Sequence, residues 1–511
     1  MTRTLYRNAR VHGAGAGVTA VAVADGRIVF TGDEDEAGAY DGDEVVDLRG
    51  ALLTPAFVDA HVHTVRTGFA HTGLDLTGAA SLTGALDALA RHASTSPGAG
   101  VLVGQGWDET DWPEQRPPTA DELERAAPGR RAYLTRVDGH SSVISPALAA
   151  LVPGLADLAG WTADGRVERD AHHAVRDVLE ELIGRDERLE AARVACRAMA
   201  AQGIAAFHEN AAPHIGPDHE IELVRRAANE VGLRATVYWG ELQAVQAARR
   251  LAVPGLAGDL VADGAFGSRT AALSTPYEDQ PQSCGHAYLT AEQVRAHVVT
   301  CTREGLQAGF HCIGDAALES IGEGLEAAER ELGAATLRAA RHRLEHVEMP
   351  SPRLVETLAR LGVVASVQPV FDGLWGGPDG MYAARLGKRW RDTNPLLDLE
   401  RAGVRLAFGS DSPVTSLGPW RAVQAAVHHR NEGQRLPAEP AFRAHTQGGA
   451  WAAKDDQGGS LQLGARADLA VWATPGGLGD NGLPHLTPGI ELPRLLRTIV
   501  SGHAVHTSEA A

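Results

Sequence analysis

The central part of the chain repeats a pattern in which a short apolar run ends in polar residues and is followed by a segment with helix signals. Such runs have the length and composition of β-strands. Eight of them lie at residues 57–64, 203–210, 234–240, 258–264, 309–314, 342–348, 363–369 and 404–411. Eight strands joined by crossover helices are typical of a (β/α)8 barrel, the α/β fold also called the TIM barrel. We therefore predict a barrel within residues 57–455.

Helix starts support this alternation between the later strands. Thr290 and Gln293 form a capping-box pattern. Ser351 followed by Pro352 is typical of a helix that begins at the proline. These starts predict helices between most of the later strands, as a barrel requires.

Two further segments lie outside the barrel pattern. Residues 1–56 and 456–511 read as short strands with glycine turns, among them a hairpin at Asp25–Gly26. Neither end has enough apolar residues for a stable sheet by itself, so we predict one small β-sandwich domain built from both ends. About 140 residues separate the first two barrel strands, which is too long for a structureless loop. An inserted subdomain is therefore predicted at about 68–200.

The net charge and the composition indicate which classes of binding partner are unfavourable. The 511 residues include 65 acidic and 47 basic ones, and the net charge of -18 repels nucleic acid and anionic membrane surfaces. No signal-peptide pattern and no apolar run of about 18 residues is found, so we expect a cytoplasmic protein that acts on a small molecule. The four cysteines are too scattered for a disulfide framework. The oligomeric state stays open, a homodimer being one option.

The stretch FVDAHVHT, residues 57–64, places two histidines two positions apart. In a strand, alternate side chains share a face, so His61 and His63 would point the same way. Two neutral imidazoles can contribute to a metal site, which usually needs three or four donors. By itself the pair is weak evidence for a metal, and a hydrogen-bonded structural pair is the favoured interpretation.

The ends of the other strands favour the metal. Active-site residues of such barrels lie at the carboxyl ends of the strands. The polar residues at these ends are His61, His63, His208, Glu209, Asp263, His311, His346 and Asp411. Because so many metal-binding side chains would meet at one mouth, the set predicts a metal centre.

The motifs resemble those of the amidohydrolase superfamily, and within it the branch of N-substituted formamide deformylase and related amide hydrolases. TPAFVDAHVH is similar to the first-strand motif, with Ala56 where glycine is usual. HCIGDAAL, HRLEHVE and FGSDSPV resemble the motifs of strands five, six and eight. RVDGHSSVISPAL (136–148) and DGAFGSRTAAL (263–273) resemble stretches of the branch, and GSLQLGARADLAVW (459–472) resembles the return into the small β-domain.

The resemblance implies a metal-dependent hydrolase that cleaves a C–N bond of a small amide, formamide or N-acyl compound. His61, His63, His311 and His346, together with Asp411, would face the metal, and the resemblance implies zinc. A bound ion lowers the pKa of water toward ~7. Asp411 would act as general base, and the metal with His140 would polarise the carbonyl.

One position departs from the family pattern. Where the branch has a lysine four residues before the Asp-Gly pair, which is carboxylated and bridges two metals, this chain has Asp259. The two lysines, Lys388 and Lys454, lie outside the predicted strands and offer no substitute. Asp259 could reach one ion or be a solvated group. We expect one ion rather than two, with Glu209 as a carboxylate that could compensate.

Three further residues are candidates for substrate binding: Trp107, Arg269 and Gln368. Trp107 could equally be a packing residue of the insertion. Arg269 could hold a substrate carboxylate or oxygen, or it could pair with a structural acid such as Asp263. Gln368 ends the seventh predicted strand and would face the pocket.

Two other functions stay open. The same metal barrel supports isomerisation and deamination. Loss of the family's lysine could also mark a non-catalytic binding protein, although a scaffold has no physical need for four histidines and Asp411 at one mouth.

Overall fold

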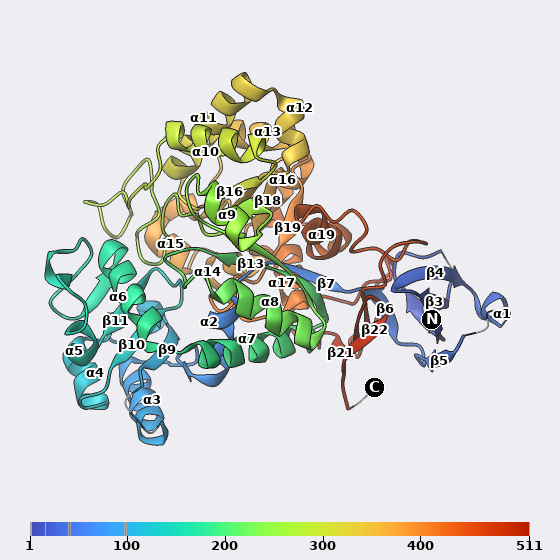
Figure 1. Ribbon diagram of the computed structural model, residues 1–511, viewed down its shortest axis with the longest axis horizontal. Helices are drawn as coiled ribbons and strands as arrows, with labels where there is room; N and C mark the ends of the chain where they lie inside the picture. The colour runs from blue at the N-terminus through green and yellow to red at the C-terminus, as the bar shows by residue number, and fades with distance from the viewer. Residues whose placement is uncertain are drawn as a thin grey trace.

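The computed structural model describes residues 3–509 except 16, 39, 41, 97 and 99. At its centre, eight parallel strands follow one another around a barrel (Figure 1). In order they are β7 (Phe57–Val62), β13 (Ile204–Ala211), β14 (Arg234–Trp239), β15 (Gly255–Leu256), β16 (Gln307–Cys312), β17 (Arg343–His346), β18 (Val364–Val367) and β19 (Leu406–Phe408). The predicted barrel is confirmed.

The barrel closes beside the first histidine pair. Val62 and Ser412 form a parallel bridge. The N–H of Asp411 donates to the carbonyl of His61 at 2.7 Å, and the N–H of His63 donates to the carbonyl of Ser412 at 2.9 Å. The residues after the last strand are therefore fixed by backbone bonds to the end of the first.

Helices surround the strands, with Thr290 and Ser351 capping two of them through their hydroxyls as the sequence predicts. The helices that follow the barrel strands are α2 (Thr64–Thr72), α7 (Arg185–Ala200), α8 (Glu220–Val231), α9 (Val245–Leu251), α10 (Ala291–Arg303), α11 (Asp315–Leu332), α12 (Ala334–Ala340), α13 (Pro352–Leu361), α14 (Pro369–Trp375), α15 (Met381–Leu386), α16 (Leu396–Arg401), α17 (Pro419–Val427), α18 (Ala438–Arg443) and α19 (Gly449–Ala452). Their apolar faces and the strands form the main core.

The fourth strand is shorter and earlier than the predicted 258–264. It comprises only Gly255–Leu256, because Gly258 has a φ of +84°, a conformation that glycine adopts most readily and that interrupts the strand. Backbone pairing resumes where the N–H of His311 donates to the carbonyl of Leu260 at 3.0 Å. Asp259 thus lies directly after a break, next to the barrel interior.

Residues between α2 and α7 contain a second sheet, at the left of Figure 1. Its order is β12 (Arg166–Glu168), β11 (Ser141–Ile144), β10 (Ala132–Arg136), β9 (Leu102–Trp107) and β8 (Leu74–Asp75). Apolar residues of α3 (Leu82–Thr95) and α4 (Ala120–Ala126) fill one core against it. Those of α5 (Pro146–Ala149) and α6 (Arg169–Leu182) fill another, and α6 also reaches the barrel mouth.

The two ends of the chain meet at the right of Figure 1. One sheet has the order β4 (Arg27–Gly32), β3 (Ala20–Ala24), β1 (Arg3–Arg7), β5 (Glu44–Asp47), with α1 (Glu34–Ala37) beside it. The other has the order β2 (Arg10–Val11), β6 (Leu52–Pro55), β20 (Leu469–Ala473), β21 (Arg494–Val500), β22 (His503–Thr507). A shared core joins them, and the hairpin turn is formed by Asp25 and Gly26, both with positive φ.

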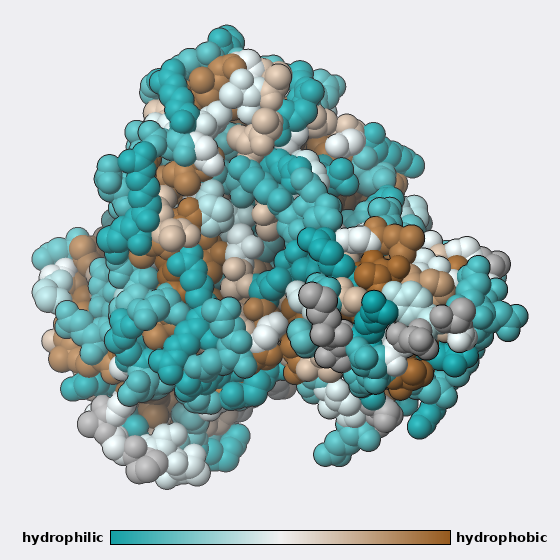
Figure 2. Space-filling model, turned by 45° about the vertical axis from the view of Figure 1, so that its right-hand side comes forward, coloured by the Kyte–Doolittle hydropathy of each residue, from teal (hydrophilic) through white to brown (hydrophobic). Residues whose placement is uncertain are grey.

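The outer surface is largely polar on the face that Figure 2 shows. On the face shown in Figure 2, hydrophilic residues predominate and hydrophobic ones are interspersed among them. None of the helices in the described part of the chain combines the length and apolarity needed to cross a bilayer.

Candidate metal centre

Six buried side chains from five strands or strand ends converge inside the barrel mouth. His61 and His63 come from the end of β7, His311 from β16 and His346 from β17. Asp411 follows β19, and Asp259 follows the break after β15. All six are at most 7% exposed, so water cannot solvate their polar atoms freely.

The facing atoms are spaced like donors around a shared ion. His61 Nε2 lies 3.5 Å from Asp259 Oδ1 and 3.3 Å from Asp411 Oδ1. His63 Nε2 lies 3.3 Å from Asp259 Oδ2 and 3.2 Å from Asp411 Oδ1, and His311 Nδ1 lies 3.7 Å from Asp259 Oδ1. Tetrahedral donors at zinc-like bond lengths would be about 3.3–3.6 Å apart.

The same atoms lack hydrogen bonds. His61 Nε2, His311 Nδ1, Asp259 Oδ1 and Asp411 Oδ1 are buried and have no hydrogen-bond partner among the described residues. Buried polar atoms are normally paired, because leaving one unpaired costs about 1–3 kcal/mol. The donor set therefore fits a cation.

Three overlapping groups of donors can be defined: His61, His63 and Asp259; His61, His346 and Asp411; and Asp259, His311 and His346. Each group shares a residue with each of the others. The overlap places His61, His346 and Asp259 at the middle of the cluster.

The outer ring nitrogens of three of the four clustered histidines are hydrogen-bonded to other groups, whereas Nδ1 of His63 has no partner among the described residues. His61 Nδ1 donates to Glu345 Oε2 at 2.9 Å, and His346 Nδ1 donates to Gln368 Oε1 at 2.8 Å. His311 Nε2 donates to the carbonyl of Gly264 at 3.2 Å. In each of these three rings the hydrogen-bonded nitrogen carries the proton. The other nitrogen therefore has its lone pair free, and it faces the cluster.

Glu345 is itself kept ionised. Burial would raise the pKa of this carboxyl, but the guanidinium of Arg343 and the contact with His61 outweigh burial and hold it at about 2. Arg343 contacts Glu345 through Nε at 2.5 Å and Nη2 at 3.0 Å. The pair therefore supplies a fixed negative acceptor behind His61.

The electrostatics of the cluster also favour a cation. Burial lowers the pKa of His63, but Asp259 and Asp411 outweigh burial and raise it to about 10. For His311, Asp259 again outweighs burial and raises the pKa to about 9. The carboxylates thus stabilise positive charge among these rings, which a divalent ion would supply.

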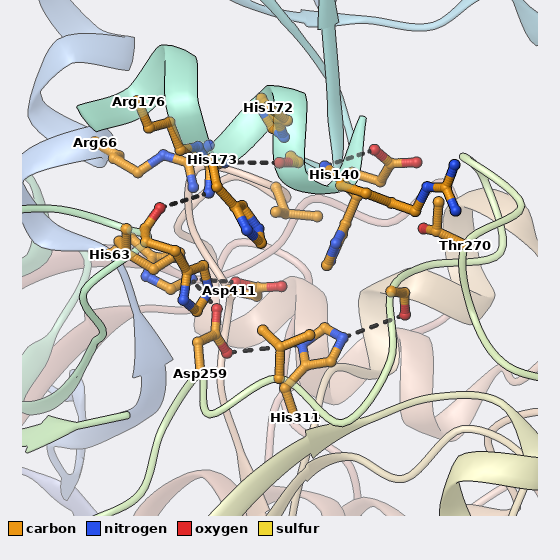
Figure 3. Close-up of a pocket in the computed structure, with 18 of the residues that line it drawn as sticks. His63, Arg66, His140, His172, His173, Arg176, Asp259, Thr270, His311 and Asp411 are labelled. Atoms are coloured by element: carbon orange, nitrogen blue, oxygen red, sulfur yellow. Dashed lines mark hydrogen bonds and ion pairs between the residues drawn. The ribbon is translucent and has the colours of Figure 1, made fainter. Parts of the chain in front are cut away.

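A pocket leads from the cluster to the insertion (Figure 3). His140 points into it, with its ring centroid 5.0 Å from that of His311. Burial, and then the charge of His311, hold the pKa of His140 well below its ordinary value, so its imidazole is neutral at pH 7. A neutral imidazole at this point can donate a hydrogen bond to a bound ligand.

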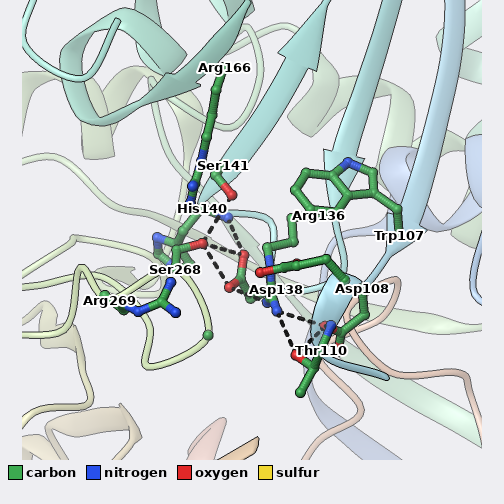
Figure 4. A network of polar contacts seen from close by, with 12 residues as sticks. Trp107, Asp108, Thr110, Arg136, Asp138, His140, Ser141, Arg166, Ser268 and Arg269 are labelled. Atoms are coloured by element: carbon green, nitrogen blue, oxygen red, sulfur yellow. Dashed lines mark hydrogen bonds and ion pairs between the residues drawn. The ribbon is translucent and has the colours of Figure 1, made fainter. Parts of the chain in front are cut away.

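Trp107 is a core residue of the insertion rather than part of a pocket wall. It is fully buried, and its Nε1 donates to the carbonyl of Leu134 at 2.9 Å. Beside it, Arg136 contacts the carboxylates of Asp108, Glu109 and Asp138 (Figure 4). This network fixes the loop that carries His140.

The remaining predicted residues also have structural partners. Arg269 pairs with Asp279, at 3.1 and 2.7 Å, and not with Asp263, whose carboxylate accepts three backbone N–H groups. Gln368 orients His346 as described. Glu209 accepts the N–H of Thr64 at 2.7 Å and belongs to none of the groups of candidate metal-binding atoms.

Sequence reasoning missed the acid behind His61 and several residues that line the pocket. The acid, Glu345, could have been found within HRLEHVE, two positions after the basic Arg343. Arg66 lies one helical turn after His63, which could have marked it. Arg176, His172 and His173 come from α6 in the insertion, and no pattern in the sequence predicts that α6 reaches the pocket.

Comparison with known proteins agrees with this geometry. The chain is 26% identical over 503 residues to the putative amidohydrolase YtcJ of Bacillus subtilis (strain 168), with 88% of this chain and 90% of that one covered. It is 24% identical over 503 residues to N-substituted formamide deformylase of Arthrobacter pascens, with 88% and 89% covered. A solved uncharacterized metal-dependent hydrolase from Pyrococcus horikoshii OT3 has the same fold, with a TM-score of 0.73, 22% identity, and 96% and 100% of the two chains covered.

A sequence model of the amidohydrolase family matches residues 44–506, which is most of the chain and includes all six clustered residues. The chain therefore belongs to the amidohydrolase family and is a hydrolase of carbon–nitrogen bonds.

Proposed function

We propose that this enzyme cleaves the C–N bond of a small amide, formamide or N-acyl compound with the help of one divalent cation, most simply zinc. The observation that carries the proposal is the cluster of buried nitrogen and oxygen atoms without hydrogen bonds at the spacing of shared ligands. The relationship to a protein named N-substituted formamide deformylase supports the choice of an amide-type substrate.

The cation would take its ligands from among His61, His63, His311, His346, Asp259 and Asp411 and would keep one position for water. A single ion is favoured because the three groups of donors overlap on His61, His346 and Asp259. Asp259 would be a direct ligand, since its two oxygens face His61, His63 and His311. Imidazole and carboxylate donors suit zinc and related ions.

When bound, the ion would supply an activated water and polarise the substrate carbonyl. Asp411 faces His61 and His63, and these rings outweigh burial to hold its pKa below the ordinary value, so it is an ionised base. It accepts the proton of the attacking water and delivers it to the departing nitrogen, which cannot leave as an anion. Neutral His140 donates a hydrogen bond to the carbonyl oxygen as negative charge develops there.

The test uses purified protein with an N-substituted formamide and an N-acetylated amine. We expect about one transition-metal ion per chain, loss of activity on chelation, and release of a carboxylic acid and an amine. Asp411→Asn should keep the backbone, since asparagine tolerates the φ of +52° at this position, and should lower kcat by about 10²–10⁴-fold. Full activity after chelation, or an isomer as product, would refute the proposal.

We also propose the division into a composite β-domain, residues 1–56 and 456–511, and a barrel with an insertion, residues 57–455. The shared core of the two terminal sheets supports it.

A cytoplasmic location is also proposed. The free thiols at Cys196, Cys284, Cys301 and Cys312 support it.

A further inference from the structure

One wall of the pocket that leads to the metal centre carries two arginines without acidic partners. Arg66 lies on α2, three residues after His63, and Arg176 lies on α6 of the insertion. Both line the pocket on the same side as His173 (Figure 3). Within the described part of the chain, neither makes an ion pair with a carboxylate. The wall is therefore positively charged.

Arg176 is held in place by neutral oxygens only. Its Nε donates to the hydroxyl of Tyr133 at 3.3 Å, its Nη1 to the carbonyl of His214 at 3.1 Å and its Nη2 to the carbonyl of Gly139 at 2.7 Å. These bonds orient the guanidinium without balancing its charge. In contrast, the buried Arg136 faces three carboxylates and the buried Arg343 faces Glu345.

Arg66 is partly buried, and its side chain has no hydrogen-bond partner among the described residues. Burial, and then the nearby charge of Arg176, lower its pKa to about 10, so it stays charged at neutral pH. The acids that also line the pocket are engaged: Asp259 and Asp411 face the clustered histidines, and Asp138 accepts from Arg136 and Ser268. A buried charge without a partner is costly, so the pair favours an anion brought by the ligand.

An apolar pocket lies beyond the metal centre. It shares His140, His311, His346 and Asp411 with the first pocket. Most of its further lining is apolar and aromatic, with Phe266, Phe371, Trp375, Met381 and Tyr382, and its one further acid, Glu348, accepts a hydrogen bond from the Tyr382 hydroxyl. The candidate metal centre therefore lies where a cationic pocket and an aromatic pocket meet.

We propose, on the basis of the proposed hydrolase function, that the substrate is an amide with a carboxylate on one side of the scissile bond, bound by Arg66 and Arg176, and an apolar group on the other, bound in the aromatic pocket. The planar fork of a guanidinium matches the two oxygens of a carboxylate. The apolar group gains from burial against aromatic rings.

The metal-loaded enzyme can be tested with N-(phenylacetyl)glycine and its uncharged analogue N-(phenylacetyl)glycinamide. We expect kcat/KM for the acid to exceed that for the glycinamide by about 10- to 100-fold, the range of a charged hydrogen bond. Arg66→Met should remove most of this preference by slowing the acid while leaving the glycinamide within about twofold. Arg225→Met is the matched control, because Arg225 on α8 only binds the carbonyls of Leu251 and Ala252.

Arg66→Met is the decisive variant, because removing this side chain breaks no hydrogen bond in the described part of the chain. Arg176→Met does break hydrogen bonds, so its result is interpreted only if its thermal unfolding matches that of the wild type. Equal rates for acid and glycinamide, or an unchanged preference in Arg66→Met, overturn the proposal while amide hydrolysis itself stands.

If neither compound nor any other amide is hydrolysed, the proposed function fails, and calorimetric titration with N-(phenylacetyl)glycine tests the anion site by itself. Weaker binding to Arg66→Met, by about tenfold or more, then supports the site. Unchanged binding overturns it, because Arg66 then does not hold the carboxylate.

Discussion

At the scale of single residues, six buried side chains at the ends of the barrel strands make up the candidate metal centre. His61, His63, His311, His346 and Asp411 were predicted to converge because the carboxyl ends of parallel strands meet at one mouth, and the structure brings them together. The sequence leaves the role of Asp259 open, because its carboxylate is on a much shorter side chain than the family's carboxylated lysine. The break at Gly258 places its carboxylate among three imidazoles.

Asp259 and Glu209 allow a matched test of which carboxylate holds the ion. Asp259→Asn removes a charge from the donor cluster and should weaken metal binding by at least about tenfold. Glu209→Gln keeps an oxygen that can accept the N–H of Thr64, so its metal affinity should be that of the wild type. Competition with a colorimetric chelator measures both, and equal losses in the two variants would contradict the assignment.

His297 gives a prediction about pH. It is fully buried on α10, its Nδ1 accepts the N–H of Gln243 and its Nε2 donates to the carbonyl of Leu256, each at 2.9 Å. Burial lowers its pKa from 6.5 to about 4, although the Leu256 carbonyl opposes this. Between pH 6.5 and pH 4 His297 binds a proton more readily in the unfolded chain than in the folded protein. The contribution of neutral His297 to the free energy of unfolding is therefore present above pH 6.5 and is lost as the pH falls toward 4.

The measurement compares denaturant unfolding of the wild type and His297→Gln. Glutamine can keep one donor and one acceptor but does not titrate. The free energy of unfolding of the wild type minus that of the variant should fall by up to about 3 kcal/mol from pH 7 to pH 4, because a tenfold change in proton affinity is worth about 1.4 kcal/mol. If the free energies of unfolding of the two proteins changed with pH in parallel, His297 would have the same pKa in the folded and unfolded states, which would contradict the prediction.

At the scale of elements, the alternation of apolar runs and helix signals predicted the barrel strands well, except for the fourth. Strand patterns are read from side chains, whereas β15 ends because of a backbone conformation at Gly258. Close contact between helices is equally hard to read from a pattern. Gly68 in α2 faces the backbone of Ala191 in α7.

Gly68→Ala tests how far this contact positions the site. An added Cβ would overlap the carbonyl of Ala191, a backbone group that cannot move aside easily. We expect a loss of at least about 2 kcal/mol in the free energy of unfolding and weaker metal binding, because α2 directly follows His63.

The matched control is Gly322→Ala in α11, where the nearest atom is the end of the Leu354 side chain at 3.3 Å. Alanine is favoured over glycine inside helices by about 1 kcal/mol, so this variant should be neutral or slightly stabilised. Chemical denaturation gives the free energy of unfolding of both variants. A Gly68→Ala variant with wild-type stability and wild-type metal binding would contradict the prediction, because α2 could then shift without affecting the site.

At the scale of the whole molecule, both chain ends contribute to the packing beneath the barrel. Trp472 of β20 is 2% exposed and lies against Phe57 and Trp420, with ring centroids 5.8 and 5.6 Å away. Its Nε1 donates to Thr54 Oγ1 at 3.0 Å. Phe57 opens the first barrel strand, so the contact joins the C-terminal sheet to the strand that carries His61.

Trp472→Ala should therefore destabilise the molecule as a unit. Loss of a buried tryptophan costs about 3–5 kcal/mol. We expect a lower Tm with one calorimetric transition, whereas Trp472→Phe, which keeps the ring packing, should lose much less. A separate early transition that leaves the main one unchanged would show that the terminal sheets unfold independently of the barrel.

The sequence by itself determined the barrel, the strand ends that carry the histidines and the association of the two chain ends, because these follow from local periodicity and from motifs of neighbouring residues. Only the tertiary structure decided which side chains become partners across long separations. It placed Trp107 in a core, paired Arg269 with Asp279, and brought Arg176 from the insertion to the pocket lined by Arg66. Such contacts depend on how the insertion and the loops pack over the barrel, and short-range sequence patterns do not predict that packing.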